Sequence, residues 1–178
     1  MVGPGSSVTD ADSSERTHGL AEQFSALARQ LEHETDVQGT LQAIVGSAVV
    51  TVPGAQHASI SAVRRRREVH TLASTDPLLV AVDRAQYETG QGPCLDSLFE
   101  QQTVRLPDLG SEQRWPDFTS QAHALGARSM LAVQLYVEGH DLGALNLLST
   151  ETDAFGEDSE RLALLFASHA AVALAGAQ

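Results

Sequence analysis

The sequence contains no lysine, one cysteine and few aromatic residues, and each shortage excludes a class of function. All 11 basic residues are arginines, against 23 acidic residues, which leaves a net charge of −12. A chain this acidic does not bind nucleic acid or an anionic membrane through its overall field. A lone cysteine cannot form an intramolecular disulfide or a cysteine zinc site. No signal peptide and no confident membrane span is visible. We therefore expect a cytoplasmic protein that has no direct contact with nucleic acid or membrane.

The composition divides the chain into a short tail and one domain. Residues 1–19 are rich in glycine, serine and acidic residues and have almost no apolar side chains. Such a segment buries too little surface to offset the entropy lost on ordering, so we expect a flexible tail. The remaining residues, 20–178, have the length of a single domain.

Apolar residues in this domain follow two periods. They recur at helical spacing in residues 20–33 and 37–52, and again from about 157 to 177. The middle of the chain combines alternating stretches with short helical patterns. The expected strands are 57–63, 68–74, 103–106, 128–137 and 141–149, and short helices are expected after Asp76, Gly92 and Pro116. This order predicts an α+β fold, in which an antiparallel sheet carries long helices on one face and short helices and loops covering a cavity on the other.

Six motifs occur within this order of elements. They are Gly90-Gln-Gly-Pro-Cys-Leu-Asp96, Leu106-Pro-Asp108, Arg114-Trp-Pro-Asp-Phe118, Gly126-Ala-Arg-Ser-Met-Leu131, Leu142-Gly-Ala-Leu-Asn-Leu147, and Phe155 with the final helix. Together they resemble the GAF domain family, and within it the GAF portion of actinobacterial GAF-ANTAR regulators. The ANTAR part has no counterpart after Gln178. The resemblance implies a GAF/PAS-like fold and a sensor and dimerisation module in signal transduction, not an enzyme.

The resemblance also implies a range of ligands and a mode of assembly. Family members bind cyclic nucleotides, tetrapyrroles, haem or small metabolites, and many have no known ligand. The Asn-Lys…Phe…Asp-Glu motif of cyclic-nucleotide binders is replaced here by Ser149-Thr150…Phe155…Ser159-Glu160, so the cofactor stays open. The last helix is apolar nearly all round, and the family commonly pairs such end helices in a homodimer.

The residues expected to bind a ligand lie on the side of the sheet that faces the predicted cavity. They are Tyr87, Cys94, Asp96, Trp115, Phe118, His123, Ser129 and Asn146. Trp115 and Phe118 could stack on a planar ligand or simply close the core. His123 is the histidine expected nearest the cavity, where it could ligate a haem iron. Asn146 lies on an otherwise apolar strand, where its amide must find hydrogen bonds. No residue spacing indicates a metal site.

Cys94 allows a third, chemical hypothesis. In the first turn of a helix, the dipole and free N–H groups would favour a thiolate, as in a redox sensor. The alternative is a small buried residue that packs under the loop. Reduction of methionine sulfoxide, known in the family, needs a second thiol that this chain lacks. The runner-up to the sensor is a ligand-free module that scaffolds a separate signalling protein.

Glycine and arginine patterns also have two interpretations. Gly90 and Gly92 could cradle an anion, but backbone turning explains them as well. The Arg64–Arg67 run could contact an anionic partner or form a solvated hairpin turn. An anionic ligand in the cavity would have to be held by backbone N–H groups and by the remaining central arginines, Arg84, Arg105, Arg114 and Arg128.

Overall fold

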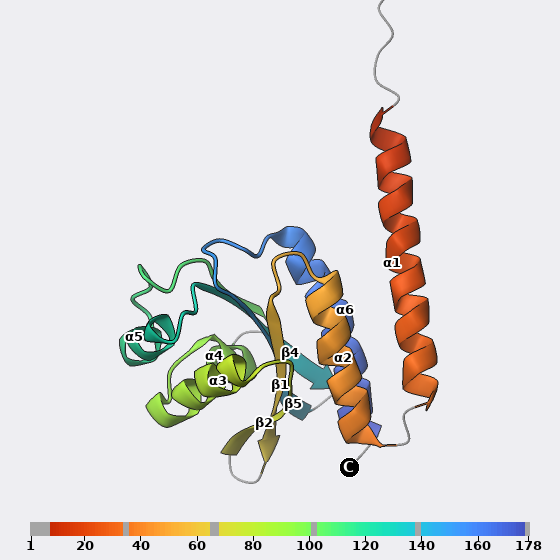
Figure 1. Cartoon of the computed structure of the whole chain (residues 1–178). Helices are drawn as coiled ribbons and strands as arrows, with labels where there is room; N and C mark the ends of the chain where they lie inside the picture. The colour runs from red at the N-terminus through yellow and green to blue at the C-terminus, as the bar shows by residue number, and fades with distance from the viewer. Residues whose placement is uncertain (1–7, 34–35, 65–67, 101–102, 138–139, 177–178) are drawn as a thin grey trace, which may run out of the picture.

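A computed structural model of the chain describes residues 8–33, 36–64, 68–100, 103–137 and 140–176 (Figure 1). The elements follow in the order α1 (Val8–His33), α2 (Val37–Thr51), β1 (His57–Arg64), β2 (Glu68–Ser74), α3 (Pro77–Thr89), α4 (Pro93–Phe99), β3 (Thr103–Leu106), α5 (Pro116–Ala124), β4 (Ser129–Val137), β5 (His140–Ser149) and α6 (Glu157–Gly176). The predicted helices and strands are thus confirmed, with boundaries shifted by one or two residues at most ends.

The strands form a single antiparallel sheet in the order β2-β1-β5-β4-β3. Helices α2 and α6 cover one face, with α1 outside them, and the short helices α3, α4 and α5 lie across the other (Figure 1). These are called the α6 face and the α3 face below. The arrangement confirms the predicted α+β fold class.

The α6 face is packed mainly with apolar side chains. Alternate residues of the strands, such as Leu131, Val133 and Leu145, point toward α2 and α6 and are fully buried. Phe166 of α6 completes this core, and its ring centroid lies 5.3 Å from that of Phe24 of α1. Burial of these residues supplies the main stabilisation of the fold, at about 25 cal/mol for each Å² of apolar surface removed from water.

Helix α1 begins at Val8, so residues 8–19, predicted to be a flexible tail, are helical. The C-terminal half of α1 packs on α2 through Leu27. The side chains of residues 13–18 are exposed, and the N-terminal end of the helix extends beyond the other elements (Figure 1). Apolar periodicity does not detect these turns because they contact little. Once packing has formed the first turns, each further exposed turn costs little. The rest of the predicted tail, 1–7, lies outside the described residues.

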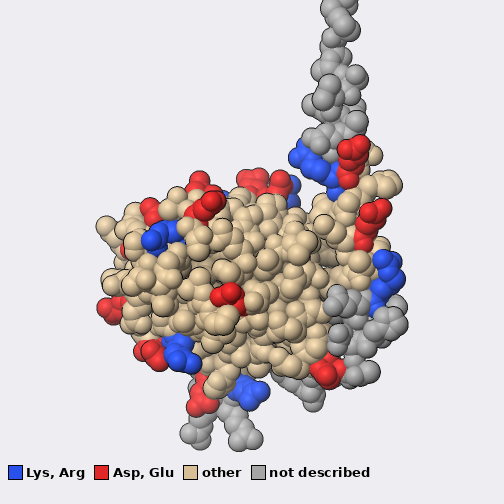
Figure 2. Space-filling view, in the orientation of Figure 1, with Lys and Arg blue, Asp and Glu red and all other residues tan. Residues whose placement is uncertain are grey.

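Both predicted hairpins are present. Strand β1 pairs with β2, and β4 pairs with β5, each antiparallel. Of the arginine run, Arg64 is exposed at the end of β1, and the other three residues lie outside the described part of the chain. Figure 2 shows acidic residues spread among uncharged areas, and the described residues of that face form no continuous basic patch. No described helix is both long enough and apolar enough to cross a membrane.

Candidate ligand-binding site

The α3 face differs from the α6 face because its centre is polar. Four strand residues with hydroxyl or amide side chains gather there. Ser59 of β1 pairs with Asn146 of β5, and Ser61 pairs with Thr71 of β2 across the next strand boundary. Because alternate residues share a face, these side chains lie together under α3. Ser59, Ser61 and Asn146 are fully buried.

Helix α3 contributes Asp83 and Tyr87, one turn apart, from above. The helix begins where Asp76 accepts a hydrogen bond from the N–H of Leu78 at 2.8 Å, with Pro77 in the first helical position. It ends at Gly90, whose φ of 66° is left-handed. Asp83 is fully buried. The helix thus holds a carboxyl and a phenol against the sheet.

These side chains form one hydrogen-bond network, called the polar cluster below. Asp83 Oδ2 accepts from Ser59 Oγ at 2.7 Å and from Thr71 Oγ1 at 2.9 Å. The Tyr87 hydroxyl lies 2.5 Å from Ser61 Oγ and 3.0 Å from Thr71 Oγ1. Asn146 Nδ2 donates to Ser61 Oγ at 3.1 Å and more weakly to Ser59 Oγ and Asp83 Oδ1. Every member of the cluster is thus tied to at least one other.

Burial controls the electrostatics of the polar cluster. Removal from water raises the pKa of Asp83 from 3.8 to about 7, and the hydroxyls of Ser59 and Thr71 offset only part of the rise. Burial and the neighbouring Asp83 also hold the pKa of Tyr87 above its usual range. No basic side chain among the described residues counters the Asp83 charge.

Two buried polar atoms beside this network have no hydrogen-bond partner among the described residues, Asn146 Oδ1 and Gln86 Nε2. Gln86 uses its other amide atom, Oε1, to accept from the Cys94 N–H at 2.8 Å. In the structure Asn146 Nδ2 faces Asp83 Oδ1, and ionised Asp83 favours this orientation of the amide because an oxygen in place of Nδ2 would face the negative charge. Buried polar groups seldom stay unpaired, so each of these two atoms has an open hydrogen-bonding position.

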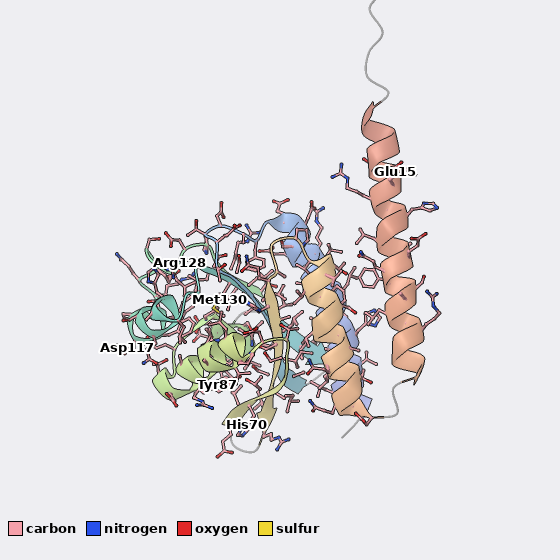
Figure 3. All side chains as sticks on the ribbon, viewed as in Figure 1. Glu15, His70, Tyr87, Asp117, Arg128 and Met130 are labelled. Atoms are coloured by element: carbon pink, nitrogen blue, oxygen red, sulfur yellow. The ribbon has the colours of Figure 1, made fainter. Side chains whose placement is uncertain are left out.

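A groove of about 520 Å³ opens on the outer side of Tyr87. Figure 3 shows Tyr87 on α3 close to His70 on β2, and both line this groove. The other lining residues are apolar or acidic: Val69, Leu95, Phe99, Glu68, Asp96 and Glu100, with Gly90 at the rim. Tyr87 therefore separates the groove from the polar cluster.

Cys94 does not have the character that its helix position predicted. It lies in the first turn of α4, as expected, but it is fully buried against Leu98 and Ala144. Burial raises its pKa from 9.0 to about 12, and the neighbouring Asp83 adds to the rise. The pKa shift thus runs against the thiolate hypothesis and supports its alternative, a small buried residue under the loop, because desolvation outweighs the end of a helix of 7 residues.

Trp115 and Phe118 lie in an apolar cluster between α3 and α5, where they pack with Leu79 and Val82. Trp115 Nε1 donates to Asp96 Oδ2 at 3.1 Å, and the Arg114 guanidinium lies 4.2 Å from the ring centroid. Of Asp96, Trp115 and Phe118, only Asp96 lines the groove. The indole therefore positions Asp96 and closes the core, as the second of its two interpretations stated.

The remaining predicted residues lie apart from the polar cluster. His123 is exposed on α5. Ser129 is buried at the start of β4, where its hydroxyl donates to the Glu151 carbonyl at 2.6 Å. Among the described residues no group of three His, Cys, Asp or Glu side chains could hold a metal ion. Of the eight predicted residues, the structure thus brings together Tyr87, Cys94 and Asn146, with Asp96 at the groove.

Sequence reasoning missed Asp83 and Gln86. Both lie on the buried face of α3, four and seven residues after Leu79, which is the spacing of its apolar stripe. A polar residue on an apolar stripe signals a buried hydrogen-bond network, and this signal was present in the sequence. The same holds for Ser59 and Ser61, which alternate with apolar residues in β1.

The Gly90-Gln91-Gly92 loop has a structural role. Both glycines have positive φ, 66° and 131°, which other residues rarely adopt. Gln91 Oε1 accepts from the N–H groups of Asp117 and Phe118 at 2.9 and 3.2 Å, so it caps the start of α5. The turning interpretation of the glycines is therefore supported, and the loop joins α3, α4 and α5 around the polar cluster.

A family model described as GAF domain matches residues 34–175. The chain belongs to the GAF domain family. GAF domains are generally signalling or ligand-binding modules. No curated protein matches the sequence, and nothing in the comparisons distinguishes an actinobacterial GAF-ANTAR subtype.

Solved structures with the same fold come from proteins of diverse activity. The GAF domain of an Acinetobacter phosphoenolpyruvate-protein phosphotransferase superposes with a TM-score of 0.69 at 14% identity, covering 88% of this chain and 93% of that one. Free methionine-R-sulfoxide reductase from Neisseria meningitidis, in complex with its substrate, gives 0.68 at 20%, covering 98% and 96%. The chromophore-binding domain of a bacteriophytochrome from R. palustris gives 0.65 at 9%, covering 90% and 64%. At these identities the likeness concerns the fold.

Proposed function

We propose that this GAF domain senses a small molecule that binds in the groove beside Tyr87 and reaches the polar cluster. The observation that carries the proposal is the unpartnered, fully buried Asn146 Oδ1, next to the buried carboxyl of Asp83. An unpaired buried acceptor costs about 1–3 kcal/mol, and a ligand that donates to it recovers that cost on binding. Tyr87 lies between cluster and groove, so a ligand in the groove would contact the cluster once the Tyr87 hydroxyl is displaced.

The signal would be a shift between two arrangements of the α3 face. Displacement of Tyr87 breaks its hydrogen bonds to Ser61 and Thr71 and loosens the hold of α3 on the sheet. The same sheet carries α6, on which Leu165 and Val172 are 49% and 70% exposed. Homodimerisation through the terminal helices, or contact with a separate signalling protein, is the output that we propose for this surface.

We propose binding and not catalysis. The neighbours in structure include a methionine sulfoxide reductase, but Cys94 is buried, has a raised pKa and is the only thiol in the sequence. The narrower resemblance to GAF-ANTAR regulators belongs to the same proposal, as a hypothesis about the output that such a sensor would control.

The test is a metabolite thermal-shift screen with native mass spectrometry of each hit. Hits are measured again on Tyr87→Phe, which removes the hydroxyl shared by groove and cluster, on Asn146→Leu, and on the control His123→Gln, an exposed residue outside the groove. We expect a bound molecule whose affinity falls in Asn146→Leu and not in the control. Tyr87→Phe lacks the hydroxyl that the ligand displaces and its hydrogen bonds to Ser61 and Thr71, so it should bind the same molecule at least as tightly as the wild type. The proposal fails if no metabolite binds, or if binding is equal in all variants; a domain that binds nothing but dimerises would favour the scaffold.

A further inference from the structure

The polar cluster has more acceptors than donors and contains no positive charge. The Ser59 and Thr71 hydroxyl protons are directed to Asp83, and the Tyr87 and Ser61 hydroxyls bond each other. The Tyr87–Ser61 bond uses one hydrogen of the pair; when Ser61 donates it, Tyr87 donates to Thr71 Oγ1 at 3.0 Å, and all four hydroxyl hydrogens are engaged within the cluster. Within the cluster, what stays open is an acceptor, Asn146 Oδ1, close to a carboxylate whose partners are all neutral. The other unpaired atom, the donor Gln86 Nε2, lies beside the cluster on a side chain whose Oε1 accepts from the Cys94 N–H.

The lining of the groove outside Tyr87 is also rich in negatively charged groups. Glu68, Asp96 and Glu100 line it, and the basic residue among its described lining is His70, which lies 3.7 Å from Glu68. Val69, Leu95 and Phe99 supply apolar surface between these charges. An acidic, partly enclosed groove raises the local concentration of cations and repels anions. An amphiphilic cation fits this lining best.

The arginines expected to hold an anion lie elsewhere. Arg84 is exposed and does not line the groove. Arg105 pairs with Glu160 of α6 at 2.9 Å, Arg114 pairs with Glu112 at 2.8 Å, and Arg128 donates to the carbonyls of His123 and Ala127. None of these four side chains lines the groove, and Arg105, Arg114 and Arg128 are engaged with other partners.

We infer that the site takes a small organic cation with N–H donors, an alkylammonium or amidinium, whose head displaces the Tyr87 hydroxyl and binds Asp83 and Asn146 Oδ1. The apolar part of the ligand would lie on Val69, Leu95 and Phe99. A buried cation is tolerated only when it is paired and hydrogen-bonded, and a carboxylate with an adjacent free acceptor meets both needs. This inference rests on the proposed sensing function and specifies its ligand class.

The ionisation of Asp83 gives the inference a pH signature. Burial places its pKa at about 7. The titratable groups that face it are Tyr87 of α3 and Cys94 of α4, both with pKa values held above their usual range; β1, β2 and β5 contribute Ser59, Ser61, Thr71 and Asn146, which do not titrate. Because only ionised Asp83 attracts a cation strongly, affinity for an alkylammonium should rise about tenfold from pH 6 to pH 8.

The experiment titrates the full chain with matched probes, followed by NMR chemical shifts so that weak binding is measurable. n-Butylammonium and benzamidinium are compared with neutral 1-butanol and benzamide, and with anionic butyrate and benzoate. Asp83→Asn removes the buried charge at constant size, and Glu88→Gln removes an exposed charge on the same helix outside the groove.

We expect both cations to shift resonances around Tyr87 and Asn146, with at least tenfold weaker binding in Asp83→Asn and none of this loss in Glu88→Gln. The wild-type pH dependence gives the same answer if Asp83→Asn does not fold. Equal binding of the neutral or anionic probes, or binding that does not depend on Asp83 and pH, would overturn the inference. A metabolite of another class that depends on Asn146 would refute the ligand class and keep the sensor, whereas no ligand of any class would refute both.

Discussion

The two faces of the sheet are built on different principles. On the α6 face, strand and helix residues such as Leu145 and Phe166 form a continuous apolar core. On the α3 face, two smaller apolar clusters flank the polar cluster around Asp83 and Asn146. Both faces contain fully buried strand residues, such as Leu145 on the α6 face and Asn146 on the α3 face. The difference therefore lies in chemistry: one face is stabilised by apolar burial, and the other keeps polar groups buried at a cost in stability.

This cost separates the roles of the two faces. A buried carboxyl without a basic partner destabilises a fold, and an apolar residue of similar size in its place would often stabilise it. A region that retains such a group is therefore a candidate for binding. The α6 face has the opposite character, since its side chains explain the fold without reference to any ligand.

Removal of a large side chain from the α6 face should have the greatest effect on stability. Phe166→Ala deletes a ring that is 1% exposed and packs on Phe24. We expect the free energy of unfolding to fall by about 3–5 kcal/mol, measured by urea denaturation. The conservative variant Phe166→Leu should lose much less. A small loss in Phe166→Ala would mean that the α6 face is not the main source of stability.

The α3 face should respond next, and through pH. The pKa of Asp83 is raised on folding from 3.8 to about 7, so the folded state holds a proton that the unfolded state releases between these values. Asp83 therefore lowers stability as pH rises from about 4 to 7, by a few kcal/mol in the absence of ligand. Asp83→Asn should remove this part of the pH dependence, seen as the difference between the two unfolding curves from pH 4 to 8.

The Asp83→Asn comparison has a direct control. Glu88→Gln makes the same chemical change at an exposed position of α3 and should leave the pH profile parallel to that of the wild type. If Asp83→Asn also gives a pH profile parallel to that of the wild type, burial does not raise the pKa of Asp83. The contrast between the two faces would then lose its electrostatic basis.

The accuracy of the predictions made from the sequence also differs between the two faces. On the α6 face, apolar periodicity alone locates the strands and long helices, since packing there depends on pattern. It fails only for residues 8–19 of α1, which are helical without a buried stripe. The order of elements and the six motifs were sufficient to identify the GAF domain family.

On the α3 face, periodicity locates the elements but not their chemistry. Asn146 was predicted as a binding residue because it interrupts an apolar strand, and Tyr87 because an aromatic side chain at the end of a short helix could line the cavity. Trp115 and His123 were chosen from their residue type, and the structure places them in a core and on the surface. The direction of the Cys94 pKa depended on long-range burial, which no local motif records.

The loop that closes the α3 face provides a finer test. At Gly92, φ is 131° and an added Cβ would collide with the Gln86 amide, whereas Gly90, with φ 66°, has open space around it. Gly92→Ala should therefore cost about 1–3 kcal/mol, and Gly90→Ala about 1 kcal/mol, by thermal or urea unfolding. Equal losses would show that the backbone conformation alone matters and that Gly92 does not hold Gln86 in place.

The smallest effect is expected where the two faces meet. Arg105 of edge strand β3 donates from Nε to Glu160 of α6 at 3.0 Å, and this ion pair ties the sheet edge to the helix layer. Both side chains are about one-third exposed, so water and salt screen the pair. A double-mutant cycle with Arg105→Met and Glu160→Gln should give a coupling energy of at most about 1 kcal/mol, smaller at high salt. A larger, salt-independent coupling would mean that a charged contact, and not the shared sheet, joins the apolar face to the polar one.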